Sequence, residues 1–387
     1  MNPASVASSA WAAARHILAI RLDHLGDVLM TTPALAAVKR QHPDVRLSLL
    51  TSPSGAEAAQ HVPEIDRCLV HAAAWMKHDP GHEPVKATRA LVQQLTDEHF
   101  DAAIIFTTCT QSALPAALLC HLAGIPLRLA HCRENPYALL TDWVPDHEVC
   151  SRGMRHEVRR QLDLVRSVGF HPTDDRLRMR FAASDTTRMR EVFAAAGGDP
   201  DQPYLVVHPG ATAASRRYPA ERFGRAADAL AEATGCQIVF TGSHDERPLV
   251  DKAAASMRHH TPITLAGQLS LGQLAALVAS AQALVCNNTG PAHMAAALGT
   301  PVVVLYALTN PQHTPWRTPS RVLSHDVPCR HCLKSVCPQG HHACLLGIEP
   351  DEVVRAVLDL LGTPVAVPLV SAMSHAPRAG ALSRVSP

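Results

Sequence analysis

The sequence predicts an α/β fold with two domains of similar size, each built on a parallel sheet, and a cleft between them. Three observations predict it: short apolar runs alternate with longer helical patterns, this rhythm breaks only once, and each half restarts with a strand and a glycine-containing turn. Strands that alternate with helices favour parallel sheets covered on both faces. The length of 387 residues is enough for two ordinary domains.

The expected strands are short apolar runs of the kind that parallel sheets bury. In chain order they are Ile17–Ile20, Arg46–Leu50, Ala102–Phe106, Tyr204–His208, Gln237–Thr241, Ala283–Cys286 and Val302–Tyr306. The helices expected between them are Leu29–Gln41, Gln111–Leu122, Ala220–Ala233, Leu271–Ala281 and Pro291–Leu298. Ligands usually bind beyond the carboxyl ends of such strands, so functional residues are expected in the cleft.

The rhythm breaks between Gly169 and Pro203, where the sequence is charged, irregular and spaced by Gly and Pro. We expect the domain boundary there, with an N-terminal domain over residues 15–185 and a C-terminal domain over residues 186–364. Residues 1–14 are Ala- and Ser-rich and are interpreted as a flexible leader. Residues 365–387 lack periodicity and predict a disordered tail.

Composition excludes several classes of protein. Lys plus Arg number 35 and Asp plus Glu number 34, so no global field points to nucleic acid or to an anionic membrane. No apolar run of about 18 or more residues predicts a membrane span. Of the 11 cysteines, those scattered through apolar or mixed segments are typical of buried free thiols in a reducing compartment, which predicts the cytoplasm. The scattered ones are Cys68, Cys109, Cys120, Cys132, Cys150, Cys236 and Cys286.

The first candidate site is the sequence RLDHLGDVLMTTP, in which a strand ends near Arg21 and a helix begins close to Asp27. Gly26 lets the backbone approach a ligand closely. The free N–H groups and the dipole of a helix N-terminus keep a carboxylate ionised, so Asp27 could take a proton from a sugar hydroxyl. A helix cap is the alternative role, for either Asp27 or Asp23.

The second candidate is HPGATAASRRYP, a loop of small residues that follows a strand and contains Thr212 and Arg216. Small residues let backbone N–H groups converge on an anion, and guanidinium groups bind phosphate oxygens in pairs. A solvated basic turn is the alternative. After the next strand, Asp245 and Glu246 could bind ribose hydroxyls or cap a helix.

The third candidate is CNNTGPAH, which leads into a helix that starts at Pro291 and ends before Gly299. Asn, Thr and Gly at the start of a helix make an anion site. An ordinary strand-to-helix junction is the alternative.

In this order and spacing, the motifs RLDHLGDVLMTTPAL, HPGA…SRRYPAERF, NNTGPAHMAAALGTPVVVLY and TNPQHTPW resemble glycosyltransferase family 9, the ADP-heptose:lipopolysaccharide heptosyltransferases and their relatives. The resemblance extends from about residue 17 to residue 361. It implies a GT-B architecture of two facing Rossmann-like domains, with the acceptor held mainly by the first and the nucleotide donor by the second. It also implies an inverting transfer of heptose from ADP-heptose onto a lipopolysaccharide core or a related cell-surface glycan, with no obligatory cofactor or metal.

The resemblance also assigns roles residue by residue. Asp27 falls on the catalytic base, Arg216 on the contact to the donor diphosphate, and Asp245 or Glu246 on the ribose-binding carboxylate. The donor-binding residues in the loops of the second domain are Thr212, Asn288, Thr289, Gly290, Pro291 and His293. The residues on the acceptor side are Arg21, Asp23, Gly26 and Arg128. The chain departs from the family pattern at three places: Asn288 replaces an Asp, Arg216 replaces a Lys, and Asp23 and His24 replace two small hydroxyl residues.

The partners implied are a nucleotide-sugar donor, ADP-linked, and a lipopolysaccharide core or lipid-linked glycan as acceptor, with no nucleic acid. Such an acceptor implies that the protein acts in the cytoplasm and makes peripheral contact with the inner face of the membrane. Two alternatives stay open: a nucleotide-sugar epimerase of GT-B fold, which would isomerise the donor alone, and a non-catalytic nucleotide-sugar-binding protein. A dinucleotide oxidoreductase is disfavoured, because neither half opens with G-x-G-x-x-G and a ribose-binding acid.

The four clustered cysteines have the spacing C-x2-C-x4-C-x6-C, with histidines between them. They are Cys329, Cys332, Cys337 and Cys344. Four soft ligands this close could bind zinc, but the spacing is not that of a regular zinc ribbon. We therefore expect free or disulfide-capable thiols and no stoichiometric metal.

Overall fold

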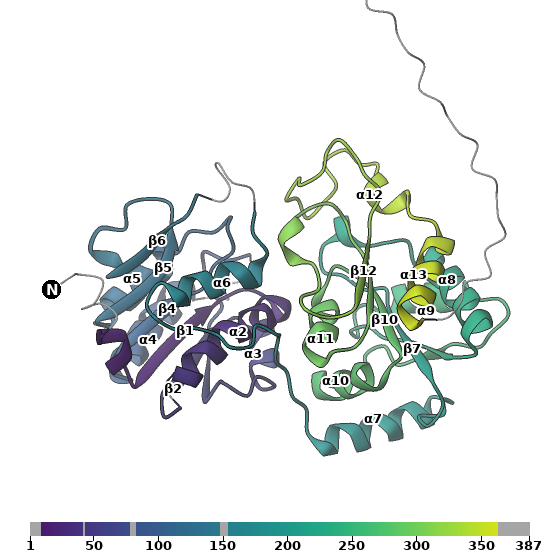
Figure 1. The fold of residues 1–387 in the computed structure, drawn as a ribbon, viewed down its shortest axis with the longest axis horizontal. Coiled ribbons are helices and arrows are strands. Elements are labelled where there is room, and N and C mark those ends of the chain that lie inside the picture. Colours follow the sequence, from purple (N-terminus) through teal and green to yellow (C-terminus); the bar gives the residue numbers. More distant parts are fainter. Residues whose placement is uncertain (1–8, 42, 78–82, 148–153, 363–387) are drawn as a thin grey trace, which may run out of the picture.

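The computed structural model describes residues 9–41, 43–77, 83–147 and 154–362, which form two α/β domains that face each other (Figure 1). Each domain contains a six-stranded parallel sheet, with the order β3-β2-β1-β4-β5-β6 in the first and β12-β11-β10-β7-β8-β9 in the second. The predicted disordered tail and Cys150 lie outside the described residues.

The first domain contains β1 (His16–Arg21), α2 (Leu25–Gln41), β2 (Arg46–Thr51), α3 (Pro53–Ala59), β3 (Arg67–Val70), α4 (Pro84–Asp97), β4 (Ala102–Ile105), α5 (Leu114–Leu122), β5 (Leu127–Cys132), η1 (Tyr137–Leu139), β6 (Asp142–Pro145) and α6 (Glu157–Arg166). β1 and β4 lie at the centre of the sheet and β3 and β6 at its edges. The central strands are buried because they carry continuous apolar runs.

The second domain contains α7 (Ala183–Ala195), β7 (Tyr204–His208), η3 (Ala214–Arg216), α8 (Ala220–Thr234), β8 (Gln237–Phe240), α9 (Arg247–Ala254), β9 (Ile263–Thr264), α10 (Leu271–Ser280), β10 (Ala283–Asn287), α11 (Gly290–Leu298), β11 (Val302–Leu305), η4 (Pro311–His313), β12 (Ser320–Leu323), α12 (Ala343–Leu346) and α13 (Pro350–Leu361). Gly235 and Gly299 end α8 and α11 in the left-handed conformation, with φ of 67° and 79°. Helices commonly end at a glycine in this conformation.

Three expectations are corrected by the structure. α2 begins at Leu25 rather than Leu29, which puts Asp27 inside the first turn of the helix. The stretch expected to be irregular contains α7, which packs on α10, and the expected boundary between residues 185 and 186 falls within α7. The part of the leader that the structure describes is not frayed: Trp11 is fully buried, and its indole N–H donates to Asp142 at 3.0 Å.

α2 is the element that links the two domains. It packs on α6 and α3 in its own domain and on α11 in the other. A helix covered on several sides must be apolar around most of its circumference, and α2 buries its residues almost without interruption from Val28 to Val38. The start of α2 is thereby held against the second domain, at the carboxyl end of β1.

Two Rossmann-like domains that face each other across their strand ends are the GT-B arrangement that the resemblance implied. Among the helices of the described residues, none is both long enough and apolar enough to cross a membrane.

Candidate functional site

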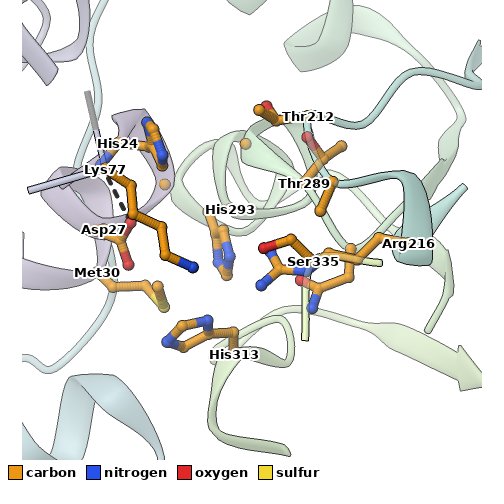
Figure 2. Close-up of a pocket in the computed structure, with 14 residues that line it drawn as sticks. His24, Asp27, Met30, Lys77, Thr212, Arg216, Thr289, His293, His313 and Ser335 are labelled. Atoms are coloured by element: carbon orange, nitrogen blue, oxygen red, sulfur yellow. Dashed lines mark hydrogen bonds between the residues drawn. The ribbon is translucent and has the colours of Figure 1, made fainter. Parts of the chain in front are cut away.

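A cavity of about 380 Å³ lies between the two domains. The first domain lines it with the start of α2 and with Lys77, and the second with the loops after β7, β10 and β11 (Figure 2). The lining residues are His24, Gly26, Asp27, Met30, Lys77, Thr212, Ala213, Arg216, Asn288, Thr289, Gly290, His293, His313 and Ser335. The three separate sequence motifs therefore meet in one place.

Arg21 organises the acceptor side of the cavity from within the core. Its guanidinium is fully buried and contacts three carboxylates: Asp23 at 2.9 Å, Asp27 at 3.2 Å and Glu157 at 2.8 Å. Buried charges are tolerated when they are paired in this way. Of the three carboxylates, only Asp27 lines the cavity, and it also accepts the backbone N–H of His24 at 3.2 Å. Asp27 is therefore both a cap of α2 and a carboxylate exposed to a ligand, so the two alternatives for it are compatible.

The surroundings separate the pKa values of Asp27 and Asp23. Burial opposes the ionisation of both. For Asp27, Arg21 and His313 outweigh burial and hold the pKa below its ordinary value. For Asp23, burial wins over Arg21, and the neighbouring charge of Asp27 raises the pKa further. Asp27 is thus the more acidic member of the pair and is ionised at neutral pH, as a group that accepts a proton must be.

The loop after β7 is fixed by contacts at both of its sides. The side chain of Asn287, at the end of β10, accepts the N–H of Tyr218 at 3.0 Å and donates to the carbonyl of Pro209 at 2.8 Å. On the other side, the N–H and hydroxyl of Ser215 donate to the carbonyls of Ser335 and Lys334. Arg216 is therefore presented to the cavity by a loop whose backbone is held in place.

Besides Nε2 of His313 and Oε1 of Gln312, three buried polar atoms on the second-domain side of the cavity have no hydrogen-bond partner among the described residues. They are Nε of Arg216, Nδ2 of Asn288 and Nδ1 of His293. All three residues line the cavity, at or near the N-terminus of α11. Buried polar atoms are nearly always paired, so their convergence indicates a polar ligand. The free N–H groups at the start of α11 favour an anionic one.

The two domains touch at Gly26 and His293. A Cβ atom on Gly26 would lie 2.7 Å from Cδ2 of the His293 ring, so only glycine permits this approach. Burial lowers the pKa of His293 to about 3, with a further lowering by His313. The ring is therefore neutral at the centre of the cavity, between the base candidate and the arginine (Figure 2).

The two candidate ribose carboxylates differ in their placement. The side chain of Asp245 is fully exposed and contacts only the neighbouring His244, at 3.8 Å. Glu246 turns inward: it accepts the N–H of Ser243 at 2.9 Å and lies 3.7 Å from Nε2 of His208. The Glu246 carboxylate fills the space where a side chain on Gly210 would be. Neither side chain lines the cavity, and the inward orientation favours Glu246 over Asp245 as the candidate ribose carboxylate.

The structure also separates the predicted acceptor-side residues. Gly26 lines the cavity, whereas Arg21 and Asp23 are buried and do not line it. Arg128 lies away from it on β5, where its guanidinium donates to backbone carbonyls of Leu139 and Ala138. The prediction of a substrate contact for Arg128 is therefore not supported by its position. Pro291 opens α11 beside the cavity.

Six lining residues had no predicted role: His24, Met30, Lys77, Ala213, His313 and Ser335. All except Lys77 lie in segments already singled out: His24 and Met30 in RLDHLGDVLMTTP, Ala213 in HPGATAASRRYP, His313 in TNPQHTPW, and Ser335 between clustered cysteines. Lys77 had no signal in the sequence.

The four clustered cysteines are free and half-buried, with Cys329, Cys332 and Cys337 in the loop between β12 and α12 and Cys344 in α12. Sγ of Cys329 lies 3.8 Å from Nε2 of His341. Within the described residues, no three His, Cys, Asp or Glu side chains are grouped as metal ligands. Ser335 and Lys334, which hold the arginine loop, belong to this same cysteine loop.

Facing Rossmann-like domains, with a carboxylate on one side of the cleft and an anion-binding loop on the other, define a glycosyltransferase of the GT-B class. Residues 88–343 match the profile of glycosyltransferase family 9 (heptosyltransferase). The chain belongs to this family, and it is an enzyme that transfers a sugar.

Individual relatives agree with this assignment. Lipopolysaccharide heptosyltransferase 1 of Pseudomonas aeruginosa is 27% identical over 355 residues, which cover 89% of this chain and 91% of the relative. Among solved structures, a family 9 glycosyltransferase from Veillonella parvula has a TM-score of 0.75 at 22% identity, covering 90% of this chain and 97% of that one. The E. coli ADP-heptose lipopolysaccharide heptosyltransferase II has a TM-score of 0.70 at 23% identity and covers 89% and 98%.

Proposed function

We propose that the enzyme transfers heptose from ADP-heptose to a lipopolysaccharide core, with inversion at the anomeric carbon. The observation that carries the proposal is the placement of ionised Asp27 across one cavity from Arg216 and the start of α11. A base on one side and an anion site on the other suit a single in-line displacement. The relatives named for heptosyl transfer support heptose as the sugar.

In this mechanism Asp27 accepts the proton of the acceptor hydroxyl as the oxygen attacks the anomeric carbon. The bond to the diphosphate breaks on the opposite face, and negative charge grows on the leaving group. Arg216 and the free N–H groups at the start of α11 stabilise that charge. Glu246, whose carboxylate lies beside Gly210 in the loop after β7, would accept hydrogen bonds from the donor ribose. Closure of the domains at the Gly26–His293 contact would exclude water, which otherwise competes as acceptor.

We place the reaction in the cytoplasm, at the inner face of the membrane where a lipid-linked acceptor would be presented. The ten cysteines of the described residues are all free, which supports a reducing compartment. The roles of the chain's own residues need no resident metal or cofactor, and the nucleotide sugar is a substrate.

The donor class is tested by thermal shift with ADP-, UDP- and GDP-sugars. A ligand at about 100 times its Kd stabilises a protein by about 2.7 kcal/mol, so the true donor should raise the Tm most. We expect ADP-heptose to do so, and to be consumed only when acceptor is added. Stabilisation by UDP- or GDP-sugars alone would contradict the donor, and an isomer formed from donor alone would favour the epimerase. Binding without turnover on any acceptor would favour the non-catalytic alternative.

A further inference from the structure

The segment after β11, residues 310–317, crosses from the second domain to the first. Its Trp316 ring stacks on His156 with ring centroids 4.4 Å apart, and its indole N–H donates to the carbonyl of Asp175 at 2.7 Å. Nε2 of His156 lies 2.8 Å from the carbonyl of Thr314. This crossing segment therefore contacts the start of α6, the helix whose first residue is Glu157.

Within the crossing segment, His313 faces that buried carboxylate. Nε2 of His313 lies 3.9 Å from Oε2 of Glu157, and neither atom has a hydrogen-bond partner among the described residues. Both side chains are nearly inaccessible, at 11% and 1% exposure. Two unpaired polar atoms that face each other from two domains are about 1 Å short of a hydrogen bond. A small closing movement between the domains would form it.

The neighbours of His313 determine which ring nitrogen carries the proton. The hydroxyl of Thr309 donates to Oδ1 of Asn310 at 2.6 Å, which leaves Nδ2 of Asn310 to donate to Nδ1 of His313 at 2.7 Å. Because Nδ1 accepts, the neutral ring carries its proton on Nε2, the nitrogen that faces Glu157. The ring is therefore prepared to donate across the domain interface.

On the other side of Glu157 lies the base candidate. Oε1 of Glu157 accepts from Nη1 of Arg21 at 2.8 Å, and Nη2 of Arg21 contacts Asp27 at 3.2 Å. The orientation of Arg21 thus depends on both carboxylates. Fixing the free oxygen of Glu157 would fix the guanidinium, and with it the Asp27 carboxylate.

We propose that His313 is a positioning residue for glycosyl transfer: as the domains close, its Nε2–H donates to Glu157 and locks the Glu157–Arg21–Asp27 chain in the geometry for proton transfer. This inference rests on the proposed role of Asp27 as base. The second domain, which binds the donor, thereby sets the base in the first. An empty or open enzyme would hold Asp27 less firmly.

The test compares His313→Gln with His313→Asn. The Gln amide can put an N–H near the position of Nε2, whereas the Asn amide is shorter by one methylene and cannot reach Glu157. We expect His313→Asn to lower kcat about 10- to 100-fold, the usual effect of a loosely held reacting group. KM and the calorimetric Kd for the donor should change little. His313→Gln should recover most of the lost kcat.

A double-mutant cycle with Asp27→Asn locates the effect. If His313 acts through Asp27, adding His313→Asn to Asp27→Asn should lower single-turnover rates no further. Trp316→Leu is the control: it loosens the same segment but leaves the Glu157 contact, so it should lower the Tm more than kcat.

Four results would overturn the proposal: wild-type kcat in His313→Asn, equal loss in the Gln and Asn variants, additive losses with Asp27→Asn, or a loss confined to donor KM. Near wild-type turnover of Asp27→Asn alone would instead refute the proposed base. The two failures can be told apart, because the proposed base is tested by Asp27→Asn with His313 intact, and the role of His313 is tested by the variants at position 313.

Discussion

Asp23 and Asp27 share one arginine, yet their surroundings give the two carboxylates opposite pKa shifts. The difference comes from what else each one meets. Asp27 faces His313 and the cavity, whereas Asp23 is enclosed and is repelled by the charge of Asp27. One member of the pair can therefore serve as a base while the other helps to orient the arginine.

Asp27→Asn should preserve the fold and donor binding but remove most transfer, because an amide cannot accept the proton. Loss of a general base typically costs on the order of 10²–10⁴-fold in rate. Steady-state transfer with ADP-heptose and calorimetry with the donor check both halves of this expectation. A variant with nearly full turnover would leave Asp27 only the capping role that its bond to the His24 N–H already shows.

Arg216→Ala should weaken the binding of free ADP and slow transfer, because the guanidinium meets the diphosphate before and during the reaction. A charged hydrogen bond contributes about 1.5–3 kcal/mol, which is roughly a 10- to 150-fold change in Kd. Calorimetry with ADP measures it. Arg217→Ala is the matched control, because the Arg217 Nε donates to the carbonyl of Ala211 and the residue does not line the cavity. Unchanged ADP affinity in Arg216→Ala would move the phosphate site elsewhere.

The donor-side residues could be predicted from the sequence because they are consecutive. Thr289, Gly290 and His293 follow one strand and open one helix, so local structure alone brings them to one edge of the sheet. Glu157 and His313 could not be found in this way. Their proximity to Asp27 depends on how two domains dock, and no local pattern encodes that contact.

At the scale of elements, α2 and α11 meet where the domains do, and glycine makes their approach possible. Gly26 lies in the first turn of α2, and His293 is the fourth residue of α11. The contact places the candidate base and the donor loop at the N-termini of two helices that touch.

Gly26→Ala tests this contact. Alanine favours a helix over glycine by up to about 1 kcal/mol, but the new methyl group would meet the His293 ring at 2.7 Å. Overpacking costs about 1–3 kcal/mol, so the ring or the facing domain must shift. We expect a Tm within a few degrees of wild type and a kcat lowered about 10- to 100-fold, since small misplacements at a reacting centre have such effects. Wild-type kcat would mean that catalysis does not need this approach.

The cysteine loop, residues 329–344, could be a zinc site or a loop of free thiols, and the two alternatives predict different experimental results. Its backbone holds Ser215, beside Arg216, so any change in the loop should reach the donor site. If Cys329, Cys332, Cys337 and Cys344 bound zinc, the purified protein would carry about one equivalent of metal. Chelation would then lower the Tm and weaken ADP binding.

We expect the opposite: no stoichiometric zinc by elemental analysis, and transfer activity that survives a chelator. The described side chains contain no grouping of three metal ligands, and the sequence spacing is not that of a regular zinc ribbon. A full equivalent of zinc in freshly purified protein would refute this expectation and make the loop a metal-stabilised support for Arg216.

All but one of the interior strands of the two sheets could be predicted, whereas β5 and the edge strands could not. Tyr204–His208 has the predicted bounds, and the six other expected strands agree to within one residue at each end, because continuous apolar runs are typical of central parallel strands. β6 and β12, whose residues are all half-buried or exposed, lack that pattern. α7 was missed because its charged sequence lies between glycines and prolines, and its helix is stabilised by packing on α10.

At the scale of the whole molecule, both domains bury histidines in neutral form. Burial lowers the pKa of His131 to about 4, with a further lowering by Arg160, and that of His293 to about 3. His16, His71, His156 and His208 are shifted in the same direction, with burial as the largest cause. A molecule with many such residues should lose stability at a mildly acidic pH, before its carboxylates titrate.

The direction follows from proton binding. Above about pH 6.5, the ordinary pKa of histidine, neither state binds the proton and these residues do not affect stability. As the pH falls below that value the unfolded chain binds protons first, so stability decreases until the folded pKa is reached. At pH 5 each fully shifted histidine should cost about 2 kcal/mol.

We therefore expect the free energy of unfolding, measured by urea titration, to fall steeply between pH 7.5 and pH 5. His131→Gln should make that fall smaller by about 2 kcal/mol. His131 suits this test because it lies outside the cavity and its Nε2 bonds only to the carbonyl of Arg160, which a Gln amide can also reach. The exposed His244 is the matched control, and His244→Gln should leave the pH dependence as it is. An identical pH dependence in His131→Gln and in the wild type would show that His131 has the same pKa in the folded and unfolded chain, and that burial does not dominate it.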